Sequence, residues 1–451
     1  MSTTRIWIRD PLATFTATRE EAPRGVVVEG SRIAELVGPA GPEAPVDEVV
    51  DARDVVLTPG LVNCHHHFYQ TLTRAHPGAL DRELFDWLKA LYPVWSRLEP
   101  EDVAAATELA LAELMLSGCT TAADHHYVFP AGLEEGVDVQ ARAVERLGAR
   151  ALLTRGSMSL GEAEGGLPPD TVVQAEEAIL RDSERVIAAH HDASADARVR
   201  IALAPCSPFS VTETLMLESA ELARRHGVRL HTHLGETLDE DAWCLRTHGV
   251  RPLDYLERCG WLAPDVWLAH GIHFDDVELR RLGAAGTGIC HCPSSNMLLG
   301  SGTCRVPEAE AAGVPVGLGV DGSASNDASN MIAEARQAML LQKLARGSAA
   351  VTARDALRWA TAGGAAVLGW PEIGRLEVGA AADLALFGLD ELRFSGVGDP
   401  LSGLLYSGAQ RVRDLMVGGR WRIRDGAFVD LDVEALRARH GARARRLLAD
   451  V

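Results

Sequence analysis

Four short apolar segments of this chain each end in a histidine or a carboxylate, and this recurrence limits the folds that the chain can adopt. They are LVNCHHH at 61–67, VRLHTHLGE at 228–236, DVWLAHGIH at 265–273 and VPVGLGVDG at 314–322. Uninterrupted apolar strands are typical of parallel sheets that are buried on both faces. In an α/β barrel the carboxyl ends of all strands meet at one face, which carries the active site. The pattern therefore predicts a barrel whose polar strand ends converge.

The segments between such strands have the pattern of amphipathic helices. Two examples are EDVAAATELALAELMLSG at 101–118 and TETLMLESAELARRHG at 212–227, in which apolar residues recur at helical spacing. Strands that alternate with helices indicate crossover connections and a parallel sheet. Because this alternation extends over residues 59–373, we expect a (β/α)8 barrel of the TIM type with insertions.

The two ends of the chain have a different texture. Residues 1–58 and 374–430 contain short β-type segments that are punctuated by Gly and Pro and lack a helical period. Such segments can pair because the termini of a domain often lie close together. We therefore expect a small β-sandwich domain formed by both segments, beside the barrel domain at 59–373. The remaining residues, 431–451, predict a basic amphipathic helix that packs on the surface.

Composition excludes several classes of function. The chain has 63 acidic and 44 basic residues, a formal net charge of −19, whereas nucleic-acid binding needs clustered Lys and Arg. No apolar run of about 18 residues is present, so no membrane span is expected. The N-terminal segment also lacks the apolar core of a signal peptide. These features favour a cytoplasmic protein that acts on a small molecule.

The eight cysteines do not indicate a disulfide framework. They are scattered along a long chain without a secretion signal, which predicts reduced, buried thiols. Cys290 and Cys292 are close in sequence, but no second pair at zinc-finger spacing accompanies them. We therefore expect these two thiols to be core residues rather than metal ligands.

The residue types at the strand ends predict a metal site instead. His65 and His67 are two residues apart, so both side chains point to the same side of their strand. His233 and Asp321 end two further strands. Imidazole nitrogens and carboxylate oxygens are suitable ligands for Zn²⁺, Fe²⁺ or Mn²⁺. A single histidine at a strand end is more often structural, and an Asp before Gly often only forms a turn, so the indication comes from the recurrence.

Longer motifs around these residues resemble a known family. They are PGLVNCHHH at 59–67, HTHLGE at 231–236, LAHGIH at 268–273, HCPSSNMLLGSG at 291–302, GLGVDGSASND at 317–327 and GRLEVGAAADLALF at 374–387. As a set they are similar to the amidohydrolase superfamily, and within it to the branch of aminohydrolases and chlorohydrolases that act on purines, pyrimidines and triazines. The resemblance covers essentially the whole chain. It implies a mononuclear site, because the stretch 150–206, where binuclear relatives carry a bridging lysine, contains no Lys.

The resemblance also implies roles for individual residues. Asp321 would bind the metal and accept the proton of the attacking water, and Glu236 would protonate a ring nitrogen of the substrate. His270 would hold the water and stabilise the oxygen that develops at the attacked carbon. The metal would be one divalent ion, Zn²⁺ by default with Fe²⁺ as the alternative. Its implied ligands are His65, His67, His233 and Asp321.

The motifs are most similar to those of enzymes that hydrolyse 8-oxoguanine to urate and ammonia. The acid at Glu236 supports an amino leaving group, because some triazine chlorohydrolase-like members lack an acid at this place. A flat heteroaromatic substrate is recognised by amide-like edges, guanidinium groups and aromatic faces. The residues predicted to bind it are Gln70, Trp87, His126, Arg155 and Asn296, with Phe68 and Tyr69 as further aromatic faces.

Several alternatives stay open at this point. Other aminoheterocycles (guanine, isoguanine or a hydroxyatrazine-like triazine) would use the same site, and a nucleoside deaminase would need a longer pocket. A ring-opening hydrolase would release no ammonia. A protein of another class, a non-catalytic ligand-binding member of the barrel family, would be expected to have lost a metal ligand or the proton shuttle. For the oligomeric state, the resemblance suggests a homodimer.

Overall fold

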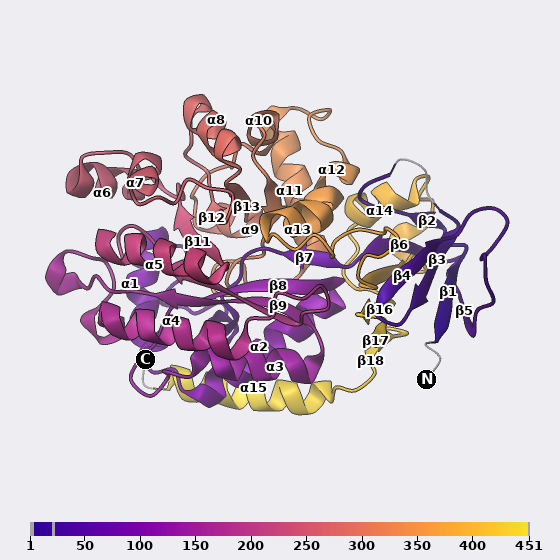
Figure 1. The fold of residues 1–451 in the computed structure, drawn as a ribbon, viewed down its shortest axis with the longest axis horizontal. Helices are drawn as coiled ribbons and strands as arrows, with labels where there is room; N and C mark the ends of the chain where they lie inside the picture. Colours follow the sequence, from indigo (N-terminus) through magenta and orange to yellow (C-terminus); the bar gives the residue numbers. More distant parts are fainter. Residues whose placement is uncertain (1–3, 20–22, 450–451) are drawn as a thin grey trace.

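The computed structural model describes residues 4–19 and 23–449, and its centre is a closed barrel of eight parallel strands (Figure 1). The strands are short, and nearly all of their residues are buried. The predicted TIM-type barrel is therefore confirmed. In chain order the strands are β7 (Leu61–Asn63), β8 (Cys119–His126), β9 (Arg150–Ser157), β10 (Val199–Pro205), β11 (Arg229–Leu234), β12 (Val266–His270), β13 (Gly288–His291) and β14 (Val316–Leu318).

Helices surround the barrel, as the alternation in the sequence predicts. Helix α5 shows how local sequence sets their ends. The hydroxyl of Thr212 accepts a hydrogen bond from the N–H of Leu215 at its start, and Gly227 ends it in the left-handed conformation (φ 66°). The helices around the strands are α2 (Pro100–Leu116), α3 (Gly136–Leu147), α4 (Glu176–His190), α5 (Glu213–His226), α8 (Asp276–Ala285), α10 (Val306–Ala311), α11 (Met331–Arg346), α12 (Ala353–Arg358), η4 (Trp359–Gly363), α13 (Gly364–Val367) and α14 (Pro400–Tyr406).

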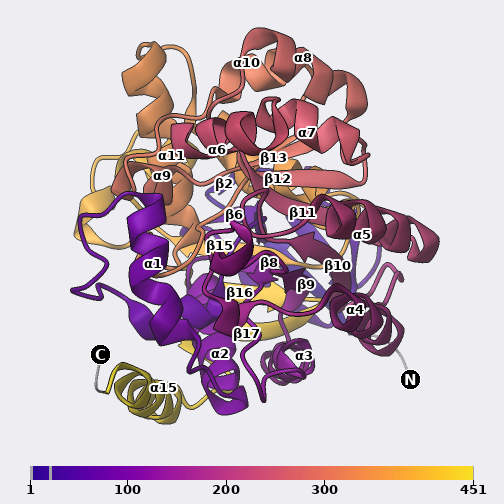
Figure 2. The ribbon, with the colours of Figure 1, turned by 90° about the vertical axis from the view of Figure 1, so that its left-hand side faces the viewer.

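A second group of shorter elements follows the carboxyl ends of the strands, and Figure 2 shows α1, α6 and α9 around this end of the barrel. The segment η1–α1 comes directly after the strand that leads into His65 and His67. The elements of this group are η1 (Phe68–Thr73), α1 (Leu84–Trp95), η2 (Glu162–Glu164), η3 (Asp170–Val172), α6 (Leu238–His248), α7 (Pro252–Arg258) and α9 (Pro293–Leu298).

Two further sheets lie at the opposite end of the barrel from α1 and α6 (Figure 1). One has the order β4-β3-β1-β5, and the other, β18-β17-β16-β15-β6-β2, contains strands from both ends of the chain. Strand β6 pairs antiparallel with β15, and buried side chains from both sheets form one shared core. The bounds are β1 (Arg5–Arg9), β2 (Ala13–Thr14), β3 (Gly25–Glu29), β4 (Arg32–Leu36), β5 (Glu48–Asp51), β6 (Val55–Pro59), β15 (Leu384–Gly388), η5 (Leu392–Phe394), β16 (Asp414–Val417), β17 (Arg420–Arg424) and β18 (Ala427–Phe428). The domain limits at 58, 373 and 430 stay a prediction.

The C-terminal helix α15 (Val433–Leu448) returns along the barrel to α2 and η1 (Figure 1). Arg443 pairs with the buried carboxylate of Asp102 through a contact of 2.6 Å, and Arg446 pairs with the same carboxylate. Leu447 is fully buried in the apolar cluster that contains α1. The helix predicted at 431–451 therefore packs on the molecule beside η1 and α1; residues 450–451 lie outside the described part.

Two expectations from composition concern the whole chain. Among the described residues, no helix is long and apolar enough to cross a membrane. All eight cysteines are buried free thiols, as predicted. The sulfur atoms of Cys290 and Cys292 lie 3.9 Å apart inside the protein core.

Candidate metal centre and active site

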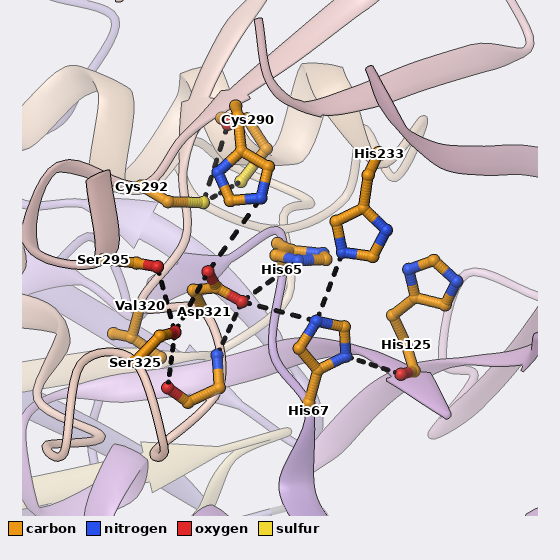
Figure 3. A network of polar contacts seen from close by, with 12 residues as sticks. His65, His67, His125, His233, Cys290, Cys292, Ser295, Val320, Asp321 and Ser325 are labelled. Atoms are coloured by element: carbon orange, nitrogen blue, oxygen red, sulfur yellow. Dashed lines mark hydrogen bonds and ion pairs between the residues drawn. The ribbon is translucent and has the colours of Figure 1, made fainter. Parts of the chain in front are cut away.

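Three imidazoles and one carboxylate converge at the carboxyl end of the barrel (Figure 3). Oδ1 of Asp321 lies 3.3 Å from Nε2 of His65 and 3.4 Å from Nε2 of His67. Nε2 of His233 lies 3.3 Å from Nε2 of His67. We call His65, His67, His233 and Asp321 the metal cluster. The structure thus brings together all four predicted ligands.

In each imidazole of the cluster, a hydrogen bond at Nδ1 determines which ring nitrogen carries the proton. Nδ1 of His67 donates to the carbonyl of His125, and Nδ1 of His233 donates to the carbonyl of Cys206, both at 2.7 Å. Nδ1 of His65 lies 2.8 Å from Nε2 of His231, a residue that orients His65. Burial lowers the pKa of all three cluster imidazoles, so the rings are neutral. Each therefore presents the lone pair of Nε2 to the others.

This arrangement fits a tetrahedral metal ion. Two lone pairs cannot hydrogen-bond each other, so the close approach of these nitrogen atoms needs a cation between them. Metal–ligand bonds of about 2.0–2.1 Å place tetrahedral ligands about 3.3–3.4 Å apart, and the observed separations are 3.3, 3.4 and 3.3 Å. Although burial alone would raise its pKa, the pKa of Asp321 lies well below its usual value because His65 is beside it. The donor set is that of a metal site.

A further imidazole, His125, lies against the cluster. Its ring stacks on His233 with centroids 4.7 Å apart, and its Nε2 lies 3.0 Å from the carbonyl oxygen of Ala204. One ligand atom of His125 lies within 4.8 Å of those of His65, His67 and His233. In the sequence, this position belongs to the histidine pair of ADHHYVF at 123–129.

Glu236 and His270 flank the metal cluster. Nε2 of His270 lies 3.5 Å from Oε2 of Glu236 and 3.9 Å from Oδ2 of Asp321, so this ring stands between the two carboxylates. Burial raises the pKa of Glu236 to about 7; Asp321 adds to this effect and His270 opposes it. A carboxyl group with a pKa near neutrality can both accept and donate a proton at that pH.

The backbone at two of these positions is in an uncommon conformation. His270 has φ 72° and Asp321 has φ 62°, values that are rare for residues other than glycine. Such conformations cost about 1–3 kcal/mol each and persist at functional sites where the surrounding structure enforces them. His270 is the last residue of β12, and Asp321 lies in the segment just beyond β14, so the barrel strands hold the two side chains in place.

His67, His233 and Asp321 of the metal cluster line a chamber at the carboxyl end of the barrel, together with apolar and polar side chains. Leu84, Trp87, Leu88 and Tyr92 of α1, together with Gln70 of η1, form a wall that we call the recognition wall. The other lining residues are His67, Tyr127, Cys206, Ser207, Phe209, His233, Glu236, His270, Leu299, Asp321 and Ser325.

Two of the predicted substrate-binding residues line this chamber. The side chain of Gln70 is fully buried, and neither its Oε1 nor its Nε2 has a hydrogen-bond partner within the described ranges. A Cβ atom at Gly322 would lie 1.8 Å from Oε1 of Gln70, so the glycine makes room for this amide. Trp87 donates from Nε1 to the carbonyl of Ala324 at 3.0 Å.

The other predicted substrate-binding residues do not line the chamber. The guanidinium of Arg155 faces α4, where Nε donates to Asp182 at 2.5 Å, and it lies over the ring of Phe129. The imidazole of His126 also packs against Phe129, with centroids 4.7 Å apart. These placements do not support contact of Arg155 or His126 with a substrate. Both residues lie within barrel strands, in which successive side chains point alternately inward and outward. The side chains of His126 and Arg155 point to the outer face, so they do not reach the chamber.

Asn296, Phe68 and Tyr69 need a similar correction. Oδ1 of Asn296 accepts a hydrogen bond of 3.0 Å from Nδ1 of His270, so Asn296 orients His270 from behind. Phe68 and Tyr69 are buried in the protein core and are not among the described residues that line the chamber. Their place is taken by side chains that the sequence did not single out, namely Tyr92, Cys206, Phe209 and Ser325.

The sequence and the fold both match known proteins. The model of the amidohydrolase family matches residues 56–422. The chain is 63% identical to 8-oxoguanine deaminase from Pseudomonas aeruginosa over 99% of both chains. It is 40% identical to hydroxydechloroatrazine ethylaminohydrolase from Pseudomonas sp. strain ADP, over 89% of this chain and 85% of the relative. The crystal structure of atrazine chlorohydrolase from Arthrobacter aurescens complexed with zinc superposes with a TM-score of 0.92 at 31% identity, over 97% of this chain and 100% of the other. The chain therefore belongs to the amidohydrolase family.

Proposed function

We propose that this amidohydrolase is a deaminase that converts 8-oxoguanine and water to urate and ammonia. The observation that carries the proposal is the 63% identity to an 8-oxoguanine deaminase over 99% of both chains. The relative that acts on a triazine is less similar, at 40% identity. The lining of the chamber combines apolar and aromatic side chains with a few polar groups, as small-molecule sites typically do.

We further propose that the metal cluster binds one Zn²⁺ ion. Three neutral imidazoles and one carboxylate suit zinc, and a crystal structure of a related chlorohydrolase contains this metal. Fe²⁺ would use the same ligands. A divalent ion lowers the pKa of water to about 7 and so supplies hydroxide at neutral pH.

The flanking residues would move the protons of the reaction. Asp321 accepts the proton of the attacking water, and Glu236 donates a proton to the ring nitrogen next to the attacked carbon. His270, held by Asn296, donates a hydrogen bond to the oxygen that becomes negative as the carbon turns tetrahedral. The carbon–nitrogen bond then breaks as the carbon–oxygen double bond forms; the proton held by Asp321 leaves with the amino group as ammonia, and the hydroxyl proton returns to Glu236.

Gln70 would orient the base. Its amide offers one acceptor and two donors, all without partners in the part of the chain that the structure describes. A buried amide without partners is costly, because it has lost its hydrogen bonds to water. The edge of an oxopurine carries both N–H donors and carbonyl acceptors and would satisfy this amide.

The test is ammonia release from the zinc-loaded protein, with ultraviolet spectra of the product. The bases to compare are 8-oxoguanine, guanine, isoguanine and a hydroxy-aminotriazine, and the protein treated with a chelator is the control. Fast release from 8-oxoguanine with formation of urate is the expected result. Release from the triazine alone would overturn the choice of substrate and retain the mechanism. No release from any base, with zinc bound, would overturn the proposed deamination of these rings.

A further inference from the structure

The recognition wall contains one hydroxyl group, and it belongs to Tyr92. This residue lies in the last part of α1, and its side chain is 1% exposed. It lines the same chamber as Glu236 and Asp321. Its neighbours along the wall, Leu84 and Leu88, offer no polar group. Tyr92 is therefore an isolated polar feature on an otherwise mainly apolar face.

The hydroxyl of Tyr92 is buried, and no residue of the described chain forms a hydrogen bond with it. Burial raises the pKa of the phenol well above its usual value, and the neighbouring Cys206 and Tyr69 act in the same direction. The phenol thus keeps its proton and is a hydrogen-bond donor. A buried donor without a partner costs about 1–3 kcal/mol, so the site is more stable when a bound molecule supplies an acceptor.

Tyr92 lines the same chamber as the metal cluster, but no ring contact joins the two among the described residues. Tyr127 contacts the cluster, with its ring centroid 5.1 Å from that of His67 and 6.2 Å from that of His233. The ring of Tyr92 instead contacts Trp95, at 6.0 Å, and no described contact joins it to a ring of the metal cluster. A base whose reacting carbon lies at the metal cluster would therefore extend toward Tyr92 with its other end.

We propose that Tyr92 is a specificity-determining residue that donates a hydrogen bond to the oxygen at C8 of an oxidised purine base. This inference rests on the proposed function, which puts C2, the carbon that carries the amino group, beside Glu236 and His270. In a purine, C2 and C8 lie at opposite ends of the fused rings. Guanine has only a C–H group at C8, so it would leave the Tyr92 hydroxyl unpaired. Sites that hydrogen-bond a substrate group discriminate strongly against an analogue that lacks it.

The test compares Tyr92→Phe with the wild type. The substitution removes the hydroxyl and retains the ring, and we expect the ratio of kcat/KM for 8-oxoguanine to kcat/KM for guanine to fall about tenfold or more. Tyr255→Phe is the matched control, because Tyr255 is also fully buried but belongs to α7 and does not line the chamber in the described chain. An unchanged ratio in Tyr92→Phe, or an equal fall in both variants, would overturn the inference. Metal content and thermal unfolding establish that each variant is folded.

Equilibrium binding separates this inference from the proposed function. Urate and xanthine, the deamination products of 8-oxoguanine and guanine, differ in the oxygen at C8 and in the ring N–H that accompanies it. Calorimetry should show that the wild type binds urate more tightly than xanthine by about tenfold, and that Tyr92→Phe loses this preference. Equal affinity of the wild type for both products, together with rapid release of ammonia from 8-oxoguanine, would overturn the role of Tyr92 alone. Binding of neither product and no ammonia would overturn both.

Discussion

The metal cluster and the recognition wall line one chamber, yet they are built differently. The cluster residues lie at or just beyond the carboxyl ends of barrel strands, and each imidazole is held by a hydrogen bond on its far nitrogen. The recognition wall belongs to a helical segment outside the barrel, which is attached by side-chain bonds such as that from Trp87 to Ala324. Under the proposed function, the barrel would supply the chemistry, and the segment η1–α1 would supply contacts that select the substrate. Substitutions in the two regions should separate turnover from affinity.

The largest effect is expected in the metal cluster. Asp321→Ala removes the carboxylate that lies 3.3–3.4 Å from two imidazole nitrogens, so the variant should lose most of its metal and about 10³-fold or more in turnover. Metal analysis and ammonia release measure the two losses. Ser323→Ala, which leaves every cluster ligand in place, is the control. Normal metal content and turnover in Asp321→Ala would remove this residue from the site.

The second effect concerns the support of the recognition wall. Asp102 is fully buried and pairs with Arg443 and Arg446 of α15. Replacing both arginines with alanine leaves this carboxylate without these partners, and the free energy of unfolding should fall by about 3 kcal/mol. Denaturant unfolding of the zinc-loaded protein measures the change. Arg437→Ala, on an exposed part of the same helix, is the control. Equal stability of the double variant and this control would show that α15 does not brace α1 and η1.

The third effect separates proton transfer from metal binding. Glu236→Gln retains the shape of the side chain and lies outside the metal cluster, so zinc should stay bound while turnover falls about 10²-fold or more. Because burial raises the pKa of Glu236 to about 7, its carboxyl is protonated below that pH and loses its proton above it. If the protonated form is the donor, wild-type turnover declines as the pH rises past about 7, and Glu236→Gln lacks that decline. Near-normal turnover in the variant would remove Glu236 from the mechanism.

The same contrast explains how much of the site could be predicted from the sequence. A barrel brings all strand ends to one face, so an imidazole or carboxylate at a strand end is placed by topology alone. His65, His67, His233 and Asp321 were found in this way, and the family motifs added Glu236 and His270. The two additional sheets were also visible as β-type segments at both ends of the chain. These predictions needed no knowledge of side-chain packing.

The recognition wall could be predicted only in part. Gln70 and Trp87 were found because they lie close to the metal strand in sequence. Tyr92 was missed. Its position depends on how α1 packs against a loop and against α15, and the periodicity of the strands carries no information on that packing. Arg155 was placed at a strand end, but β9 continues to Ser157 and turns this side chain outward. An error of two residues in a strand boundary was enough to change the predicted role.

The smallest expected effect tests how firmly the recognition wall is held. Trp87→Phe retains an aromatic ring in the chamber but removes the N–H that donates to the carbonyl of Ala324 at 3.0 Å. One lost hydrogen bond of about 1 kcal/mol should raise KM about fivefold, with a smaller change in kcat, because the metal cluster is untouched. Steady-state kinetics with 8-oxoguanine measure both constants.

Trp95→Phe is the matched control for this prediction. Trp95 lies in the same helix, is fully buried and does not line the chamber in the described chain, and its Nε1 donates to Thr73 at 3.2 Å. If only Trp87→Phe raises KM, the bond to Ala324 holds the wall against the loop that follows β14, and recognition depends on that single attachment. If both variants raise KM equally, α1 acts as one rigid body whose overall packing matters. If kcat falls as strongly as KM rises, the division between chemistry in the barrel and recognition in α1 is wrong, because moving the wall would then also disturb the metal cluster.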